Sequence, residues 1–292
     1  MKKYSVESIA EELRQLGLCL GDTVFVKADL MKVGYIKDAP RSGLLEALLR
    51  VIGSEGTLVI SAFTESYFLP TLRPEHCFTA ETLPNSGALA RLIVQRPDAK
   101  RSAHPTNSFA AIGPKSDYIL EGHDALSPSY LPIQKLIDKP SKCLSIGCVE
   151  SSPGFTTTHW AQYLLNQSTQ NVFSGLVGAY YMKDGVRNVF KRRDIGGHNP
   201  GAYKLYAHYV NKGLLRTGFV GDTYAVLGDT DALYKVDYEV MKDHPRYILC
   251  SDPQCFDCRA TWWYNKRDMP RYFLWSFPKK LFKKFVLKFK KS

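Results

Sequence analysis

The chain has 292 residues, of which 45% are hydrophobic and 23% are charged, a composition typical of a folded domain with a sizeable core. It contains no run of 18 apolar residues, so a membrane-spanning helix is not expected. The net charge of +11 is concentrated at the C-terminus, because residues 276–292 hold seven lysines and no acid. The rest of the chain carries only about +4, so nucleic acid is not the expected partner.

The first half of the chain alternates capped helices with short apolar strands. Apolar residues recur at helical spacing in the helices, and Ser or Gly bounds most segments. Helices are predicted at 6–16, 42–53 and 86–96, and buried strands at 22–30, 56–64 and 142–148. This alternation predicts an α/β sandwich with a central sheet.

The pattern changes beyond residue 165. Residues 170–194 are β-rich around Lys183-Asp184-Gly185, which predicts a hairpin with its turn there. Residues 218–242 predict short β segments followed by a helix. One domain is expected over 1–244. Residues 245–292 are expected to form an appendage with a Cys-rich segment and a basic amphipathic tail.

The pattern of the N-terminal residues and the number of cysteines indicate the cellular compartment of the protein. The first 17 residues have helical spacing with acids between the apolar positions, whereas a signal peptide has an apolar block and a cleavage site. The seven cysteines are an odd number, and disulfides are not expected in a reducing cytoplasm. A cytoplasmic location is predicted, and the tail could hold the protein at the inner face of the membrane.

The stretch SSPGFTTTHWAQ, residues 151–162, leads from small and hydroxylic residues to His159. Taken alone, His159 is either a packed helix histidine beside Trp160 or a base at a helix N-terminus. Histidine suits general-base chemistry because its ordinary pKa lies near working pH.

Three segments resemble the aminoglycoside 3-N-acetyltransferase family, which differs from the common GNAT acetyltransferase fold. They are GLLEALLRVIGSEGTLVISAFT, SGALARLIVQRPDAKRSAHPTNSFAAIG and GFTTTHWAQ, and the resemblance covers about residues 5–240. The middle segment is the most specific, because Arg-Ser-x-His-Pro-x-x-Ser followed by Phe-Ala-Ala-Ile-Gly matches the family pattern almost in full. The resemblance implies a three-layer α/β/α sandwich around a central mixed sheet.

The resemblance also implies transfer of an acetyl group from acetyl-CoA to an amine of a small-molecule amino sugar. The family's histidine falls at His159 and its acid, about 35 residues later, at Asp194. We expect His159 to act as general base, with Asp194 bonded to its other ring nitrogen and no acyl-enzyme formed. Oxyanion stabilisation and substrate positioning are expected from Thr156, Thr157, Thr158 and Gln162. Alternatively, Asp194 could form an ion pair with Arg192 or Arg193 on a surface strand.

Cofactor binding is expected from two segments. They contain Leu30, Met31 and Lys32 in the first loop, and Arg101, Ser102, His104 and Ser108 in the matched run. The alternative is that this run is only a turn specific to the fold.

The first loop departs from the family pattern, with Lys27 and Asp29 in place of His and Ser. Gln162 stands where the family usually has Glu, and Ala90 stands at an often acidic position. Because the substrate site then has fewer acidic residues than is usual in the family, we expect an acceptor that carries fewer positive charges than an aminoglycoside.

His244, Cys250, Cys255 and Cys258 fall within fifteen residues and could bind zinc or an iron–sulfur cluster. The alternative is a reduced cluster in a loop. Behind it, the apolar residues of 281–289 share one helical face among lysines, which predicts an anchor on an anionic membrane surface. A helix packed on the core would show the same pattern.

We therefore expect an N-acetyltransferase acting on a nucleotide- or lipid-linked amino sugar in surface-polysaccharide biosynthesis. The alternatives are an aminoglycoside antibiotic 3-N-acetyltransferase that confers resistance, a non-catalytic glycan-precursor binding or scaffold protein, and a redox protein based on the cysteines.

Overall fold

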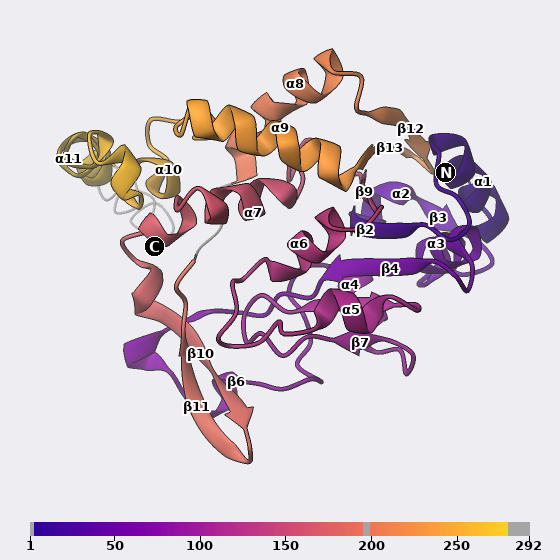
Figure 1. The fold of residues 1–292 in the computed structure, drawn as a ribbon, viewed down its shortest axis with the longest axis horizontal. Coiled ribbons are helices and arrows are strands. Elements are labelled where there is room, and N and C mark those ends of the chain that lie inside the picture. The colour runs from indigo at the N-terminus through magenta and orange to yellow at the C-terminus, as the bar shows by residue number, and fades with distance from the viewer. Residues whose placement is uncertain (1–2, 195–198, 280–292) are drawn as a thin grey trace, which may run out of the picture.

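The computed structural model describes residues 3–194 and 199–279, and a seven-stranded mixed sheet forms its centre (Figure 1). In spatial order the strands are β12 (Arg216–Val220), β13 (Thr223–Asp229), β9 (Lys142–Ile146), β2 (Thr23–Ala28), β4 (Thr57–Ser61), β8 (Phe109–Ile112) and β7 (Lys100–Arg101). The central strands β9, β2 and β4 run parallel, and the outer strands pair antiparallel. The predicted mixed sheet is confirmed.

Helices cover both faces of this sheet. They are α1 (Val6–Leu16), α2 (Leu30–Val33), α3 (Gly43–Ile52), α4 (Ala88–Val94), α5 (Ser116–Leu120), α6 (Leu131–Ile137), α7 (Thr157–Leu164), α8 (Leu205–Asn211) and α9 (Thr230–Asp243). Alternate residues of β2 point to opposite faces, as the two-residue period of a strand requires. Val24 and Val26 pack with α1, α3 and α4, whereas Phe25 packs with α5 to α9. Two cores result, and the three-layer α/β/α prediction is confirmed.

Local sequence fixes the ends of α1. The Ser5 hydroxyl accepts from the backbone N–H of Ser8, and the Ser8 hydroxyl accepts from that of Ser5, at 3.1 and 2.9 Å. Gly17 ends the helix with φ 105°, a conformation that favours glycine. The predicted helices at 42–53 and 86–96 correspond to α3 and α4. Sequence periodicity did not reveal α5 and α6, which have five and seven residues and no side-chain cap.

A second, smaller sheet carries the predicted hairpin. It consists of β10 (Val177–Lys183) and β11 (Val186–Lys191), with β5 (Tyr67–Phe68) and β6 (Cys77–Phe78) pairing with β10. Asp184 and Gly185 form the turn with φ 51° and 75°, the positive values of a type I′ hairpin. The hairpin extends away from the large sheet (Figure 1). Two further strands, β1 (Lys3–Tyr4) and β3 (Tyr35–Ile36), pair with each other.

The chain beyond α9 forms a small core of its own. It contains α10 (Phe256–Ala260), α11 (Asp268–Arg271) and a π-helical turn at Tyr272–Ser276. Its buried residues are Leu249, Cys250, Cys255, Cys258 and Trp262, which are separate from the two cores of the main sheet. The predicted amphipathic tail helix falls at 280–292, outside the described residues. Within the described ranges, none of the helices has the length and apolar character needed to traverse a bilayer.

Candidate active site

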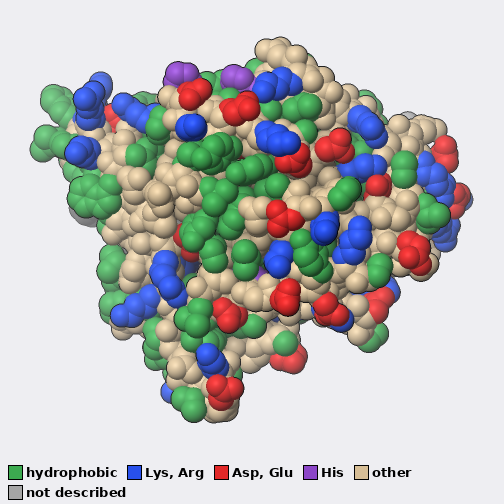
Figure 2. Space-filling model, viewed as in Figure 1, with side chains coloured by type: hydrophobic (Ala, Val, Ile, Leu, Met, Phe, Trp, Pro, Cys, Tyr) green, Lys and Arg blue, Asp and Glu red, His purple; other side chains and the backbone are tan. Residues whose placement is uncertain are grey.

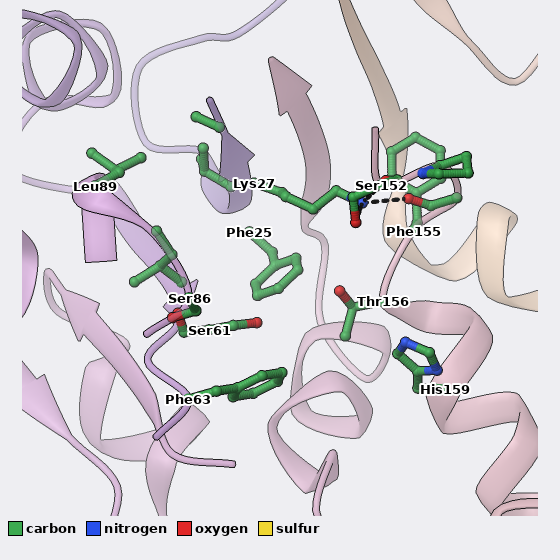
Figure 3. Close-up of a pocket in the computed structure, with 15 residues that line it drawn as sticks. Phe25, Lys27, Ser61, Phe63, Ser86, Leu89, Ser152, Phe155, Thr156 and His159 are labelled. Carbon is green, nitrogen blue, oxygen red and sulfur yellow. Dashed lines mark hydrogen bonds between the residues drawn. The ribbon is translucent and has the colours of Figure 1, made fainter. Parts of the chain in front are cut away.

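A cavity of about 230 Å³ opens at the carboxyl ends of β2 and β4, beside the N-terminus of α7. Phe25 and Phe63 lie opposite Thr156 and His159 in this cavity (Figure 3). Its polar lining consists of Lys27, Ser61, Ser86, Ser152, Thr156 and His159, and no Asp or Glu is found among the described residues that line it. Ligands of open α/β sheets bind outside the carboxyl ends of the strands, so this cavity is the candidate active site.

Lys27 holds the loop that leads into α7. Its Nζ donates to the carbonyl oxygens of Ser152 and Gly154, as the dashed lines in Figure 3 mark. Gly154 has φ 79°, and a Cβ there would lie 2.6 Å from the Cβ of Ala202. Glycine is therefore required at this bend. Loss of hydration around the ammonium lowers the pKa of Lys27 to about 8, so at neutral pH it still carries a positive charge beside the cavity.

His159 lies on the first turns of α7, half-buried at the edge of the cavity. Its Nδ1 is 3.0 Å from Oε1 of Gln162, one turn along the same helix. An Nδ1–H that donates to this amide oxygen leaves the lone pair of the neutral ring on Nε2. The Tyr130 ring lies 4.9 Å from the imidazole and restricts its orientation from the other side. With that tautomer, Nε2 is the atom that would accept a proton in general-base chemistry.

The three consecutive threonines before His159 have different roles. Only Thr156 lines the cavity. The hydroxyls of Thr157 and Thr158 donate to Oδ2 of Asp237 at 2.6 and 3.2 Å. Both are therefore turned away from the position expected of oxyanion donors. Asp237, from α9, is fully buried and also accepts from Tyr209 on its other oxygen, and the sequence analysis missed it.

Asp194 is not bonded to His159 among the described residues. Its carboxylate accepts from the backbone N–H and the hydroxyl of Ser129, each at 2.8 Å. Burial raises the pKa of Asp194 although both Ser129 donors oppose that rise. The expected His–Asp bond is thus replaced by two contacts: Gln162 orients His159, and Ser129 holds Asp194.

Arg101 and Ser108 are used inside the protein rather than at the cavity. Arg101 donates to three backbone carbonyl groups, those of Ala62, Ala80 and Thr82. Loss of hydration around the guanidinium lowers its pKa to about 10. The buried Ser108 hydroxyl donates to the carbonyl of Ala62 at 2.6 Å. These hydrogen bonds hold the bend before β8 against the end of β4. Few donors of the two side chains then remain to bind a cofactor.

Ser102 and His104 complete the same bend. The Ser102 hydroxyl accepts from the backbone N–H of Phe109 at 2.8 Å. His104 is fully buried, and its Nδ1 accepts from the N–H of Asn107 at 2.9 Å, while burial lowers the pKa of the ring well below its ordinary value. The contacts of all four predicted cofactor residues in this run support the alternative of a turn specific to the fold.

The first loop places Leu30, Met31 and Lys32 in α2, directly after the cavity-lining Ala28. The Asp29 carboxylate accepts from the backbone N–H of Met31 at 3.1 Å and so caps this short helix. Lys32 donates to the carbonyl of Gly147 at 2.9 Å. The chain's own carboxylate therefore accepts from the backbone N–H of Met31, one of the residues expected to bind the cofactor.

Of the four predicted metal ligands, three come together. The sulfur atoms of Cys250, Cys255 and Cys258 all lie within 4.8 Å of one another, and all three residues are buried. His244 does not belong to this group, because it ends α9 with an exposed side chain.

Comparison with known proteins identifies a family model and curated relatives that match this chain. A family model described as aminoglycoside 3-N-acetyltransferase matches residues 25–242. Aminoglycoside N(3)-acetyltransferase III of Serratia marcescens is 31% identical over 175 residues, covering 54% of this chain and 64% of that relative. The protein of the same name from Salmonella sp is 26% identical over 270 residues, covering 82% of this chain and 92% of the relative.

Solved structures share the fold. The apoenzyme of aminoglycoside acetyltransferase AAC(3)-IVa has a TM-score of 0.73 at 22% identity, covering 88% of this chain and 96% of that chain. The binary complex of AAC-IIIb with CoASH has a TM-score of 0.70 at 20% identity, covering 83% and 97%. At this identity the likeness supports a common fold.

Proposed function

The chain belongs to the aminoglycoside 3-N-acetyltransferase family, and on that premise we propose that it transfers the acetyl group of acetyl-CoA to an amine of an amino sugar. The observation that carries the proposal is the cavity histidine, His159, whose Nδ1 is held by Gln162. The relative crystallised with CoASH supports acetyl-CoA as the donor, and relatives bound to a gentamicin and to sisomicin support an amino-sugar acceptor.

The chemistry requires a neutral amine, because an ammonium has no lone pair with which to attack. His159 Nε2 takes the proton as the amine nitrogen attacks the thioester carbonyl carbon. The C–N bond forms and the C–S bond breaks, and the departing thiolate of CoA takes the proton from the imidazolium of His159 to leave as the thiol. Gln162 orients the ring but is neutral, so it stabilises the imidazolium less than a carboxylate would.

The cavity lining accommodates the donor in general chemical terms. Phe25, Phe63 and Leu89 offer apolar contacts for the aliphatic arm of a thioester, while Ser61 and Ser86 offer hydroxyls. The acetyl carbonyl needs hydrogen-bond donors where negative charge develops, and Thr156 at the start of α7 is suitably placed to supply one.

A second acceptor class, a sugar with a single amine from surface-polysaccharide biosynthesis, is favoured by the charge of the site. The described lining has one cationic lysine, Lys27, and no acid, whereas a polycationic aminoglycoside would be better matched by carboxylates. Gln162 adds to this argument because it is neutral. Ala90 does not, because it is buried in the core of α4 away from the cavity.

An acceptor panel tests the proposal and separates the two classes. The protein would be incubated with acetyl-CoA and, in turn, gentamicin, sisomicin, glucosamine and a nucleotide-linked amino sugar, and the free thiol of CoA would be measured. We expect thiol release with at least one acceptor, and faster release with monoamines if the charge of the cavity decides selectivity. Release no faster than with His159→Ala for every acceptor would contradict an acetyltransferase.

We further propose that the C-terminal segment contacts an anionic membrane surface. Leu274 and Trp275 are 73% and 65% exposed on the π-helical turn, with Arg271 and Lys279 nearby in sequence. Figure 2 shows hydrophobic and basic side chains together at the corner where Figure 1 places α11. Exposed aromatic residues beside cations suit the interface of an anionic bilayer.

Vesicle co-sedimentation of the full chain tests this contact. The double variant Leu274→Ser with Trp275→Ser is expected to sediment several-fold less with phosphatidylglycerol vesicles than the unaltered protein. Leu126→Ser, which changes a 68% exposed leucine elsewhere, is the matched control. Equal sedimentation of all three proteins, or equal binding to neutral phosphatidylcholine, would refute the membrane contact.

A further inference from the structure

The cysteine cluster lies outside the candidate active site, in the small C-terminal core. Cys250 comes from the loop after α9, Cys255 caps the N-terminus of α10, and Cys258 lies within that helix. Their three sulfur atoms lie within 4.8 Å of one another, although the residues belong to two different segments. Two buried cysteines facing each other would be ordinary packing, but three convergent sulfurs form a ligand set.

Backbone N–H groups point at two of these sulfurs. The N–H of Cys258 donates to Sγ of Cys255 at 3.5 Å, and the N–H of Cys250 donates to Sγ of Cys258 at 3.3 Å. Hydrogen bonds of this kind stabilise the thiolate more than the thiol, because they interact with negative charge.

The spacing of the sulfurs fits one tetrahedral ion. Zinc–sulfur bonds of about 2.3 Å at tetrahedral angles place the sulfurs about 3.8 Å apart, a distance that lies within the 4.8 Å separating the three sulfurs at most. Thiolates bound to different irons of a cluster lie farther apart, because the separation of the irons is added. The Cys-x4-Cys-x2-Cys spacing alone would also suit an iron–sulfur cluster, so it is the geometry that favours a single ion.

Two basic side chains near the cluster complement the negative charge that a metal–thiolate site would carry. Three thiolates around a divalent ion carry a net charge of −1. The Arg259 guanidinium donates to the carbonyl of Cys250, and Lys204 donates to that of Leu249 at 2.7 Å. Both cations therefore lie against the segment that would carry the negative charge, although Arg259 is also paired with Asp268 at 3.1 Å.

The surrounding core is too small to be stable through burial alone. Its apolar cluster contains five buried residues, of which three are the cysteines themselves, and the described part of the segment beyond α9 contains no strand. Small modules of this kind commonly depend on a metal or on disulfides for their stability. We propose that Cys250, Cys255 and Cys258 bind one zinc ion and that this ion stabilises the C-terminal segment.

Metal analysis of the full chain, purified without a histidine tag under reducing conditions, tests the site independently of acetyl transfer. We expect about one zinc per chain by elemental analysis. Cys255→Ser is expected to lose most of it. Cys148→Ser, a buried cysteine outside the cluster, and His244→Ala are expected to retain it.

Because Cys255→Ser could fail to fold, cobalt provides a second measurement on the unaltered chain. Reduced, metal-free protein reconstituted with cobalt(II) is expected to show thiolate-to-metal charge transfer and the intense visible bands of a tetrahedral ion. Three outcomes would overturn the proposal. One is a trace of zinc with no cobalt–thiolate absorption, another is stoichiometric iron with a brown colour, and the third is equal loss of zinc in Cys148→Ser.

Discussion

His159→Ala is expected to lower kcat by about 10²- to 10⁴-fold, the usual contribution of a general base. The loss arises because most acceptor amines are protonated at neutral pH, and no other imidazole lines the cavity among the described residues. The fold should survive, since the ring is only half-buried and lies at the edge of the cavity beside Gln162 and Tyr130. The measurement is steady-state thiol release with the best acceptor of the panel.

The matched control is His244→Ala, an exposed histidine at the end of α9. It should retain the activity of the unaltered protein within about twofold. A thermal unfolding curve for both variants distinguishes lost chemistry from lost folding. If His159→Ala kept the kcat of the unaltered protein while remaining folded, His159 would have no part in the reaction.

The sequence was sufficient to predict the layers and several of their helices and strands. Caps and apolar periods are local, so α1, α3, α4 and the central strands could be found from short windows. The position of His159 also followed, because a resemblance to a family concerns positions along the chain. The cavity confirms only that this histidine lies at the carboxyl edge of the sheet.

The contacts of side chains could not be predicted in the same way. Asp194 follows His159 at the family's spacing, yet its oxygens accept from Ser129, 65 residues earlier. His104 belongs to a specific motif, yet its ring nitrogen accepts from a backbone N–H three residues on. A matched spacing predicts which residues recur, whereas tertiary packing decides the direction in which each one points.

Asp237 is the clearest example of what the sequence left hidden. It lies 80 residues from Thr157, in a helix whose apolar period suggests only packing. In the structure its two oxygens accept from Thr157, Thr158 and Tyr209, and so join α7, α8 and α9. Through this contact the helix that carries His159 is fixed to the outer layer of the sandwich.

Asp237→Ala is expected to lower the free energy of unfolding by about 3–5 kcal/mol. The substitution leaves three buried hydroxyls without their acceptor, and each unsatisfied buried group costs about 1–3 kcal/mol before relaxation. Urea unfolding at constant pH provides the measurement. Asp231→Asn on the same helix, an exposed residue paired with Lys235 at 2.6 Å, should cost less than about 1 kcal/mol. Equal decreases in the free energy of unfolding of the two variants would mean that the buried contacts of Asp237 do not stabilise the fold.

The pH dependence of Asp237→Asn tests the charge of the same residue. Burial raises the pKa of Asp237 from 3.8 to about 7, so the folded protein binds a proton that the unfolded chain has already lost between these values. This group therefore lowers stability as pH rises from about 4 to 7, by at most about 4 kcal/mol. Buried His123, with its pKa lowered to about 3, acts in the opposite direction up to pH of about 6.5.

The difference between the unaltered protein and Asp237→Asn removes this histidine contribution, because both proteins share it. We expect the Asn variant to gain stability relative to the unaltered protein as pH rises from about 4.5 to 8, since an amide keeps an acceptor oxygen without carrying charge. A difference that stays flat across this range would mean that the carboxyl is ionised throughout. The three hydroxyl donors would then outweigh its burial, and the contact between α7 and α9 would be a charged one.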